Sequence, residues 1–141
     1  MDIVTDPTPL SVNEADRPVA LVVDDDPETR ALIAYTLERG GWSVRQARDG
    51  AQALLLAREH FPRVVVLDLA LPRLSGLSVL RTLRSWADQP TAVVVVSAFA
   101  SATYLPVLRL ADAIVKKPFR PSDLLGQVNR VGQAVWGSSR P

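Results

Sequence analysis

The chain has 141 residues, of which 48% are apolar, and this is enough to build the core of one folded domain. Its 16 basic and 15 acidic residues leave a formal net charge of +1, and this balance gives no sign of the basic stripe that non-specific binding of nucleic acid requires. The absence of cysteine excludes both a disulfide framework and a thiolate metal site.

The first 17 residues contain four acidic residues and two prolines, with no basic residue before Arg17. A secretory signal would begin with positive charge and continue into an apolar stretch, so this segment is not one. We predict a disordered leader over residues 1–17, a folded domain over 18–137 and a short tail over 138–141.

Five short apolar segments are predicted to be strands. Three of them are continuous and rich in valine, which is typical of strands buried on both faces of a parallel sheet, whereas the second alternates as an edge strand does. In chain order, the predicted strands are Val19–Val23, Trp42–Ala47, Val64–Leu67, Val93–Val96 and Ala113–Lys116.

Residues with helical spacing fill the intervals between these strands. The predicted helices are Pro27–Arg39, Ala51–His60, Gly76–Trp86, Ser101–Leu110 and Ser122–Trp136. In the second of them, the three-to-four spacing that indicates a helix is that of Leu54, Leu55 and Arg58. The fourth helix contains Pro106, so we expect a short, kinked or irregular helix there. Strands that alternate with helices predict an α/β fold: a flavodoxin-like, doubly wound, five-stranded parallel sheet in the order 2-1-3-4-5.

Residues 89–108 are 20 consecutive uncharged residues, the length of a membrane-spanning helix. The segment contains two prolines and several hydroxyl side chains, and its most apolar part is the valine block 93–96. A buried strand followed by a short apolar helix accounts for it better. We therefore expect no membrane contact and a cytoplasmic location.

Polar side chains follow the predicted strands where each one ends. Asp24 and Asp25 follow the first strand, Asp68 the third, Ser97 the fourth and Lys117 the fifth. In the predicted order these positions converge on one edge of the sheet, where ligands of doubly wound folds bind. Three carboxylates suit Mg²⁺, while a hydroxyl and an ammonium suit a phosphoryl group.

Asp26 is expected to have a different role from the two aspartates before it. It precedes Pro27 and Glu28, a pattern typical of a helix N-cap followed by proline at the first helical position. The acidic triplet is therefore divided: two residues for the site and one for the helix.

Four segments, in order, carry a resemblance to a known family: LVVDDDPETR, VVVLDLALPRLSG, VVVVSAFA and IVKKPF. Over about residues 19 to 136 the sequence resembles the receiver domain of two-component response regulators. The resemblance implies that Asp68 is the phosphoacceptor. It also implies that Asp25 binds Mg²⁺ directly, that Asp24 acts through water, and that the backbone carbonyl of Ala70 completes the metal site with Asp68.

The same resemblance implies that Ser97 bonds an oxygen of the attached phosphoryl group and that Lys117 forms an ion pair with it. It also implies a cis peptide bond between Lys117 and Pro118. His60, the only histidine, is interpreted as a structural surface residue.

The sequence departs from the family pattern at several positions. Ile114 stands where the family usually has an aromatic switch residue. Ala70 and Phe99 are apolar at two positions that tune the lifetime of the phosphoryl group, so we predict slow hydrolysis. The fourth-helix segment carries a candidate partner or dimer surface formed by Tyr104, Leu105, Val107 and Leu108.

The function expected from these features is that of a stand-alone receiver. A histidine kinase or phosphotransfer protein would phosphorylate Asp68 with Mg²⁺ bound, and this would change binding of a downstream protein or a second copy through the fourth helix, fifth strand and fifth helix. We expect no enzyme activity beyond self-phosphorylation and slow self-dephosphorylation, and no direct contact with nucleic acid.

Two alternatives remain open. The first is an interaction module that works without phosphorylation, which Ile114 and the short fourth helix favour. The second, a small Mg²⁺-dependent phosphohydrolase, is weaker because Ala70 occupies the position where an acid/base aspartate would stand.

Overall fold

A computed structural model describes residues 16–98 and 109–139. The strands are β1 (Val19–Val23), β2 (Ser43–Ala47), β3 (Val64–Asp68), β4 (Ala92–Ser97) and β5 (Ala113–Lys116), and the helices are α1 (Pro27–Arg39), α2 (Gly50–His60), α3 (Gly76–Ser85) and α5 (Pro121–Ser139). All strand pairs are parallel, in the order β2-β1-β3-β4-β5. The predicted flavodoxin-like fold is confirmed. The predicted leader and fourth helix lie largely outside the described residues and stay predictions.

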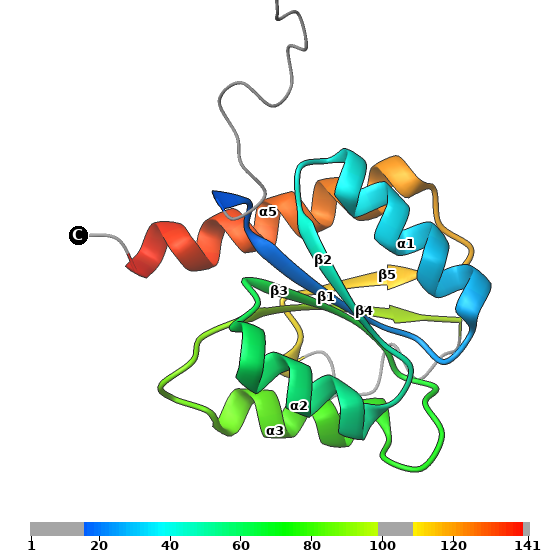
Figure 1. The fold of residues 1–141 in the computed structure, drawn as a ribbon, viewed down its shortest axis with the longest axis horizontal. Helices are drawn as coiled ribbons and strands as arrows, with labels where there is room; N and C mark the ends of the chain where they lie inside the picture. The colour runs from blue at the N-terminus through cyan, green and yellow to red at the C-terminus, as the bar shows by residue number, and fades with distance from the viewer. Residues whose placement is uncertain (1–15, 99–108, 140–141) are drawn as a thin grey trace, which may run out of the picture.

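The helices cover the sheet on both faces. Figure 1 shows α1 and α5 over one face and α2 and α3 over the other. Each face has its own apolar layer, and β3 and β4 contribute to both because successive side chains of a strand point in opposite directions. This two-sided cover explains why the central strands are continuous runs of valine.

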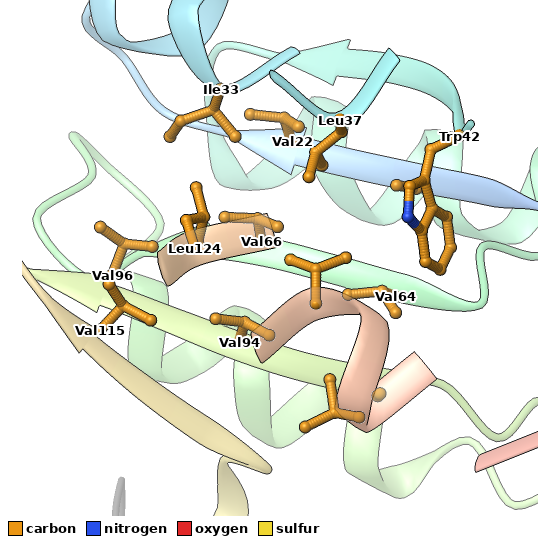
Figure 2. Packing of buried hydrophobic residues seen from close by; sticks show 14 residues of the cluster. Val22, Ile33, Leu37, Trp42, Val64, Val66, Val94, Val96, Val115 and Leu124 are labelled. Atoms are coloured by element: carbon orange, nitrogen blue, oxygen red, sulfur yellow. The ribbon is translucent and has the colours of Figure 1, made fainter. Parts of the chain in front are cut away.

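The layer beneath α1 and α5 is closely packed. Figure 2 shows Trp42 and Val64 at one end of it and Val96 and Val115 at the other. Every residue of β3 and β4 is buried, and burying one valine side chain contributes about 1.5–3 kcal/mol to folding. The second strand, predicted to be an edge strand, lies at the edge and is partly exposed. The core thus fixes the positions at which the central strands end.

The buried face of α2 agrees only in part with the one expected, since Leu54 packs against the apolar layer beneath the helix. The helix lies against the sheet through Ala53 and Ala57, while Leu55 is 59% exposed. Small side chains allow a helix to approach a sheet closely, and a pattern of large apolar residues does not reveal that choice. Arg58 is not on the sheet face either: its guanidinium stacks on Trp86, 3.9 Å from the ring centroid.

The start of α1 confirms the expected role of Asp26. Its side chain accepts a hydrogen bond from the Thr29 N–H at 3.1 Å, and Pro27 is the first helical residue. Hydrogen bonds from Thr29 hold the pKa of Asp26 below 3.8. At the other end of the chain, α5 continues to Ser139, past the predicted end at Trp136.

None of the helices in the described part of the chain is long and apolar enough to cross a membrane.

Candidate functional site

The register of the sheet brings two aspartates together. Val23 of β1 pairs with Leu67 of β3, so that the next residue of each strand, Asp24 and Asp68, lies at the same level of the sheet edge. Asp68 in turn pairs with Val96, the residue before Ser97. The sheet therefore places side chains from three separate segments of the chain side by side.

Three carboxylates meet at this edge. One oxygen of each of Asp24, Asp25 and Asp68 lies within 4.8 Å of the others. Asp24 and Asp68 are only 1% and 5% exposed, whereas Asp25 is exposed. A set of carboxylate oxygens that is partly buried and open on one side fits Mg²⁺, which takes one or two carboxylates and keeps several waters.

Lys117 is the cation of this cluster. Its Nζ lies 3.3 Å from an oxygen of Asp24 and 3.3 Å from an oxygen of Asp68. Its main-chain N–H donates to the Ser97 carbonyl at 2.9 Å, which extends the pairing of β4 and β5 by one residue. The neighbouring Lys116 is exposed, as expected for a side chain that points away from the site.

Main-chain donors orient the two buried carboxylates. The Asp26 N–H donates to Oδ1 of Asp24 at 2.9 Å, and the Ala70 N–H donates to Oδ1 of Asp68 at 3.0 Å. In both aspartates it is the other oxygen, Oδ2, that approaches Lys117. This leaves Oδ2 of Asp68 as the oxygen turned toward the cation.

Burial and the neighbouring charges shift the pKa values of Asp24 and Lys117. Burial raises the pKa of Asp24 above 3.8, and the charge of Asp68 adds to that rise against the opposing hydrogen bond from Asp26 and the attraction of Lys117. Burial alone would lower the pKa of Lys117, but the charges of Asp68 and Asp24 outweigh it and raise that pKa above 10.5. Lys117 is thus a permanent positive charge at neutral pH.

Arg30 supports the site from the side of α1, and it is not among the residues predicted from the sequence. Its guanidinium donates to the Asp24 carbonyl at 2.9 Å and to the Gln46 side chain at 3.3 Å. It therefore ties the turn after β1 to the edge strand. Its position in the first turns of the helix that follows the acidic triplet was the available signal, because such a side chain can fold back over the preceding turn.

Of the remaining predicted positions, some are described by the structure and the others lie outside the described residues. Ser97 is 2% exposed at the end of β4, and Ile114, partly buried in β5, packs against the apolar layer beneath α2 and α3. The Lys117–Pro118 bond is cis, as expected. The candidate partner surface of Tyr104, Leu105, Val107 and Leu108, together with Phe99, lies outside the described residues.

Comparison with known sequences identifies a family and its relatives. The model of the response regulator receiver domain matches residues 20–129. The chain is 36% identical over 108 residues to the DNA-binding response regulator MtrA of Mycolicibacterium smegmatis, covering 77% of this chain and 47% of that protein. It is 37% identical over 110 residues to the transcriptional regulatory protein KdpE of Mycobacterium tuberculosis, covering 78% and 49%. The chain thus spans about half the length of the curated relatives it matches.

Solved structures show the same fold. A CheY-like receiver domain from Methanospirillum hungatei JF-1 has a TM-score of 0.82 at 24% identity, covering 88% of this chain and 100% of its own. The receiver domain of the Francisella response regulator 1452 has a TM-score of 0.75 at 31% identity, covering 83% and 98%. Because the family model covers residues 20–129 and both curated relatives are more than 30% identical over more than two thirds of this chain, the chain belongs to the response regulator receiver domain family.

Proposed function

We propose that this domain accepts a phosphoryl group on Asp68 from a histidine kinase or a phosphotransfer protein, in a Mg²⁺-dependent reaction, and that the modified domain changes its affinity for a partner protein. The observation that carries this proposal is the position of Lys117 Nζ, 3.3 Å from both Asp24 and Asp68. A nucleophilic carboxylate, an acidic pocket and a fixed cation are the components that phosphoryl transfer requires.

The residues divide the chemistry among them. An oxygen of Asp68 attacks the phosphorus of the donor, a P–O bond forms, and the donor's P–N bond breaks and leaves its imidazole free. Oδ2 is suited to this role because Oδ1 is held by the Ala70 N–H. Lys117 then pairs with a phosphoryl oxygen and the Ser97 hydroxyl donates to another. The phosphoryl group brings a charge of about −1.5 to −2 in place of the single negative charge of the carboxylate, and this draws these two groups toward it.

Mg²⁺ would be held by Asp24, Asp25, Asp68 and the Ala70 carbonyl. When bound, the ion offsets the negative charge that carboxylates and phosphoryl oxygens bring to one place. The chain supplies this set from two neighbouring strand ends, and its three carboxylates already lie within 4.8 Å of one another.

The experiment that tests the function is intact-mass measurement after incubation with acetyl phosphate. Wild-type protein is expected to gain one phosphoryl group with Mg²⁺ and none with EDTA, and Asp68→Asn is expected to gain none in either condition. An unmodified wild type, together with no calorimetric signal on Mg²⁺ titration, would contradict the proposal.

The acidic triplet offers a second test, since its members have different contacts. Asp25→Asn is expected to weaken Mg²⁺ binding by about tenfold or more with little change in stability, because Asp25 is exposed and belongs to the carboxylate cluster. Asp26→Asn is expected to retain Mg²⁺ binding, because asparagine also caps helices. Calorimetric titration of both variants with Mg²⁺ checks this. Equal losses of Mg²⁺ affinity would show that Asp25 and Asp26 do not have separate roles.

The lifetime of the phosphoryl group gives a third prediction. Ala70 is exposed beside Asp68, and its methyl group has no means of orienting an attacking water. Ala70→Asn is therefore expected to shorten the half-life of phosphorylated protein several-fold, by providing a polar side chain there. Decay of the mass adduct after removal of the donor measures this. Ala87→Asn, at an exposed position in the turn after α3, serves as the control.

The partners and the wider role follow from the same proposal. We infer that no other substrate is turned over and that a downstream protein or a second copy reads the modified state. MtrA is named as a DNA-binding protein and this chain spans half its length, so the expected lack of nucleic-acid contact applies to this domain and not to a longer protein that contains it.

A phosphorylation-independent interaction module is the second candidate. It is favoured by Ile114, an aliphatic side chain packed against the core where the family usually has an aromatic switch. Partner binding that is equal for wild type and Asp68→Asn, with and without acetyl phosphate, would support it.

A further inference from the structure

The first residue of α3 lies unusually close to the main chain of the phosphoacceptor. A Cβ atom placed on Gly76 would be 2.6 Å from the Asp68 carbonyl oxygen and 2.6 Å from the Cα of Leu69, whereas real Cβ atoms essentially never come within 3.0 Å of another group. The Gly76 N–H also donates to the Leu69 carbonyl at 3.3 Å. The end of the loop between β3 and α3 therefore packs against the main chain at the start of the same loop.

The atoms in contact belong to the backbone, so no side-chain rotation would relieve the crowding. Either the Asp68–Leu69 peptide or the start of α3 would have to move. The start of α3 is fixed by the Ser75 side chain, which accepts from the Ser78 N–H at 3.2 Å, and by Val79 and Leu80, which are fully buried. A larger residue at position 76 would therefore displace the peptide that carries Asp68.

We propose that Gly76 is a positioning residue for the phosphoacceptor: the absence of a side chain there lets α3 lie against the Asp68–Leu69 peptide and keeps Oδ2 of Asp68 aimed at Lys117. The inference rests on the proposed function of Asp68. A displaced peptide would also carry away Ala70, whose N–H holds the other oxygen of the same carboxylate at 3.0 Å. Effects of this kind are large, because a misplacement of about 1 Å can cost about 100-fold in rate.

The chain contains a matched control at the other end of the same strand. A Cβ on Gly132 of α5 would lie 2.8 Å from Cγ2 of Val64 and 2.9 Å from the Trp42 ring. Val64 begins β3 and Asp68 ends it, so both glycines let a helix approach this strand. Gly132→Ala would crowd the core without touching the site.

The test compares Gly76→Ala with Gly132→Ala and wild type, at a temperature where thermal unfolding shows all three to be folded. The initial rate of phosphorylation by acetyl phosphate at saturating Mg²⁺ is expected to fall about tenfold or more in Gly76→Ala. The Mg²⁺ dissociation constant, measured by calorimetry without a phosphodonor, is expected to rise several-fold. Gly132→Ala is expected to stay within about twofold of wild type in both, although its Tm falls.

Two outcomes would overturn the proposal: a rate and a Mg²⁺ affinity of Gly76→Ala that match those of Gly132→Ala, or effects that follow Tm alone in the two variants. If wild type gains no phosphoryl group, the proposed function fails instead. The Mg²⁺ dissociation constants then still decide whether Gly76 positions the carboxylate.

A second pair of variants keeps the proposal testable if Gly76→Ala does not fold. Ser75→Ala removes the side-chain bond that fixes the start of α3 and adds no atoms, whereas Ser85→Ala removes the bond to the Thr82 carbonyl at the far end of the same helix. Ser75→Ala is expected to slow phosphorylation about two- to three-fold, and Ser85→Ala is expected to leave the rate unchanged. Equal rates in the two variants would overturn the proposal.

Discussion

Replacing Lys117 with methionine is expected to lower the free energy of unfolding of the metal-free protein by about 2 kcal/mol. Without the ammonium, Asp24 and Asp68 would stay buried with no cation at 3.3 Å. Breaking a fully buried pair costs about 3–5 kcal/mol, and the smaller value expected here allows for the 25% exposure of the lysine side chain. Urea unfolding at neutral pH with EDTA measures the loss.

Added Mg²⁺ is expected to reduce the difference in free energy of unfolding between wild type and Lys117→Met. The ammonium and the metal ion are attracted to the same carboxylates, so the methionine variant is expected to bind Mg²⁺ several-fold more tightly than wild type does. Lys116→Met, at the exposed neighbouring position, is the control and is expected to change neither quantity. Unchanged Mg²⁺ affinity in Lys117→Met would show that Lys117 does not share the carboxylates with the metal.

The stabilisation by Lys117 also has a defined pH range. Because its folded pKa is raised above 10.5, the stabilisation is fully present below 10.5 and is lost as the pH rises through the folded value. The stabilities of wild type and Lys117→Met are therefore expected to differ at neutral pH and to converge only in strongly alkaline solution.

Asp24→Asn is expected to have the opposite effect on stability. Burial and the nearby charge of Asp68 raise the pKa of Asp24, which means that the charged form is less favourable in the native state than in the unfolded chain. The uncharged isostere should therefore stabilise the metal-free protein at neutral pH by roughly 1 kcal/mol, which is within the usual range for a single stabilising substitution. Mg²⁺ binding should weaken about tenfold or more, because a carboxylate of the metal site is lost.

The sign of the pH dependence follows from the raised pKa. Between 3.8 and the native pKa the native protein binds the Asp24 proton more strongly than the unfolded chain does, so this group's contribution to stability falls as the pH rises through that interval. The asparagine variant lacks this fall, and its advantage over wild type should grow over the same interval. Urea titrations at several pH values with EDTA test this; destabilisation by Asp24→Asn at neutral pH would contradict it.

The sequence was sufficient to predict the sheet and most of the site because two physical constraints are visible in it. A strand covered on both faces must be apolar throughout, so the valine runs at Val64–Leu67 and Val93–Val96 identify the central strands. Parallel strands end at a common edge, so the polar residue after each strand identifies a member of the site. Asp24 and Asp68 were found in this way.

Other features depend on distances that no pattern in the sequence encodes. The choice of Ala53 and Ala57 over Leu55 on the buried face of α2 reflects how closely the helix approaches the sheet. The bond from Arg30 to the Asp24 carbonyl depends on how the side chain folds back over the turn. The contact of Gly76 with the Asp68 carbonyl depends on the path of a loop.

Chemical localisation of the phosphoryl group tests the central claim most directly. Borohydride reduces an acyl phosphate to an alcohol, which converts a phosphorylated aspartate to homoserine, and peptide mass spectrometry then identifies the position. Protein treated with acetyl phosphate and Mg²⁺ is predicted to contain homoserine at Asp68, and none at Asp24 or Asp25. Homoserine at either of those two positions, or at none, would contradict the assignment of Asp68 as the phosphoacceptor.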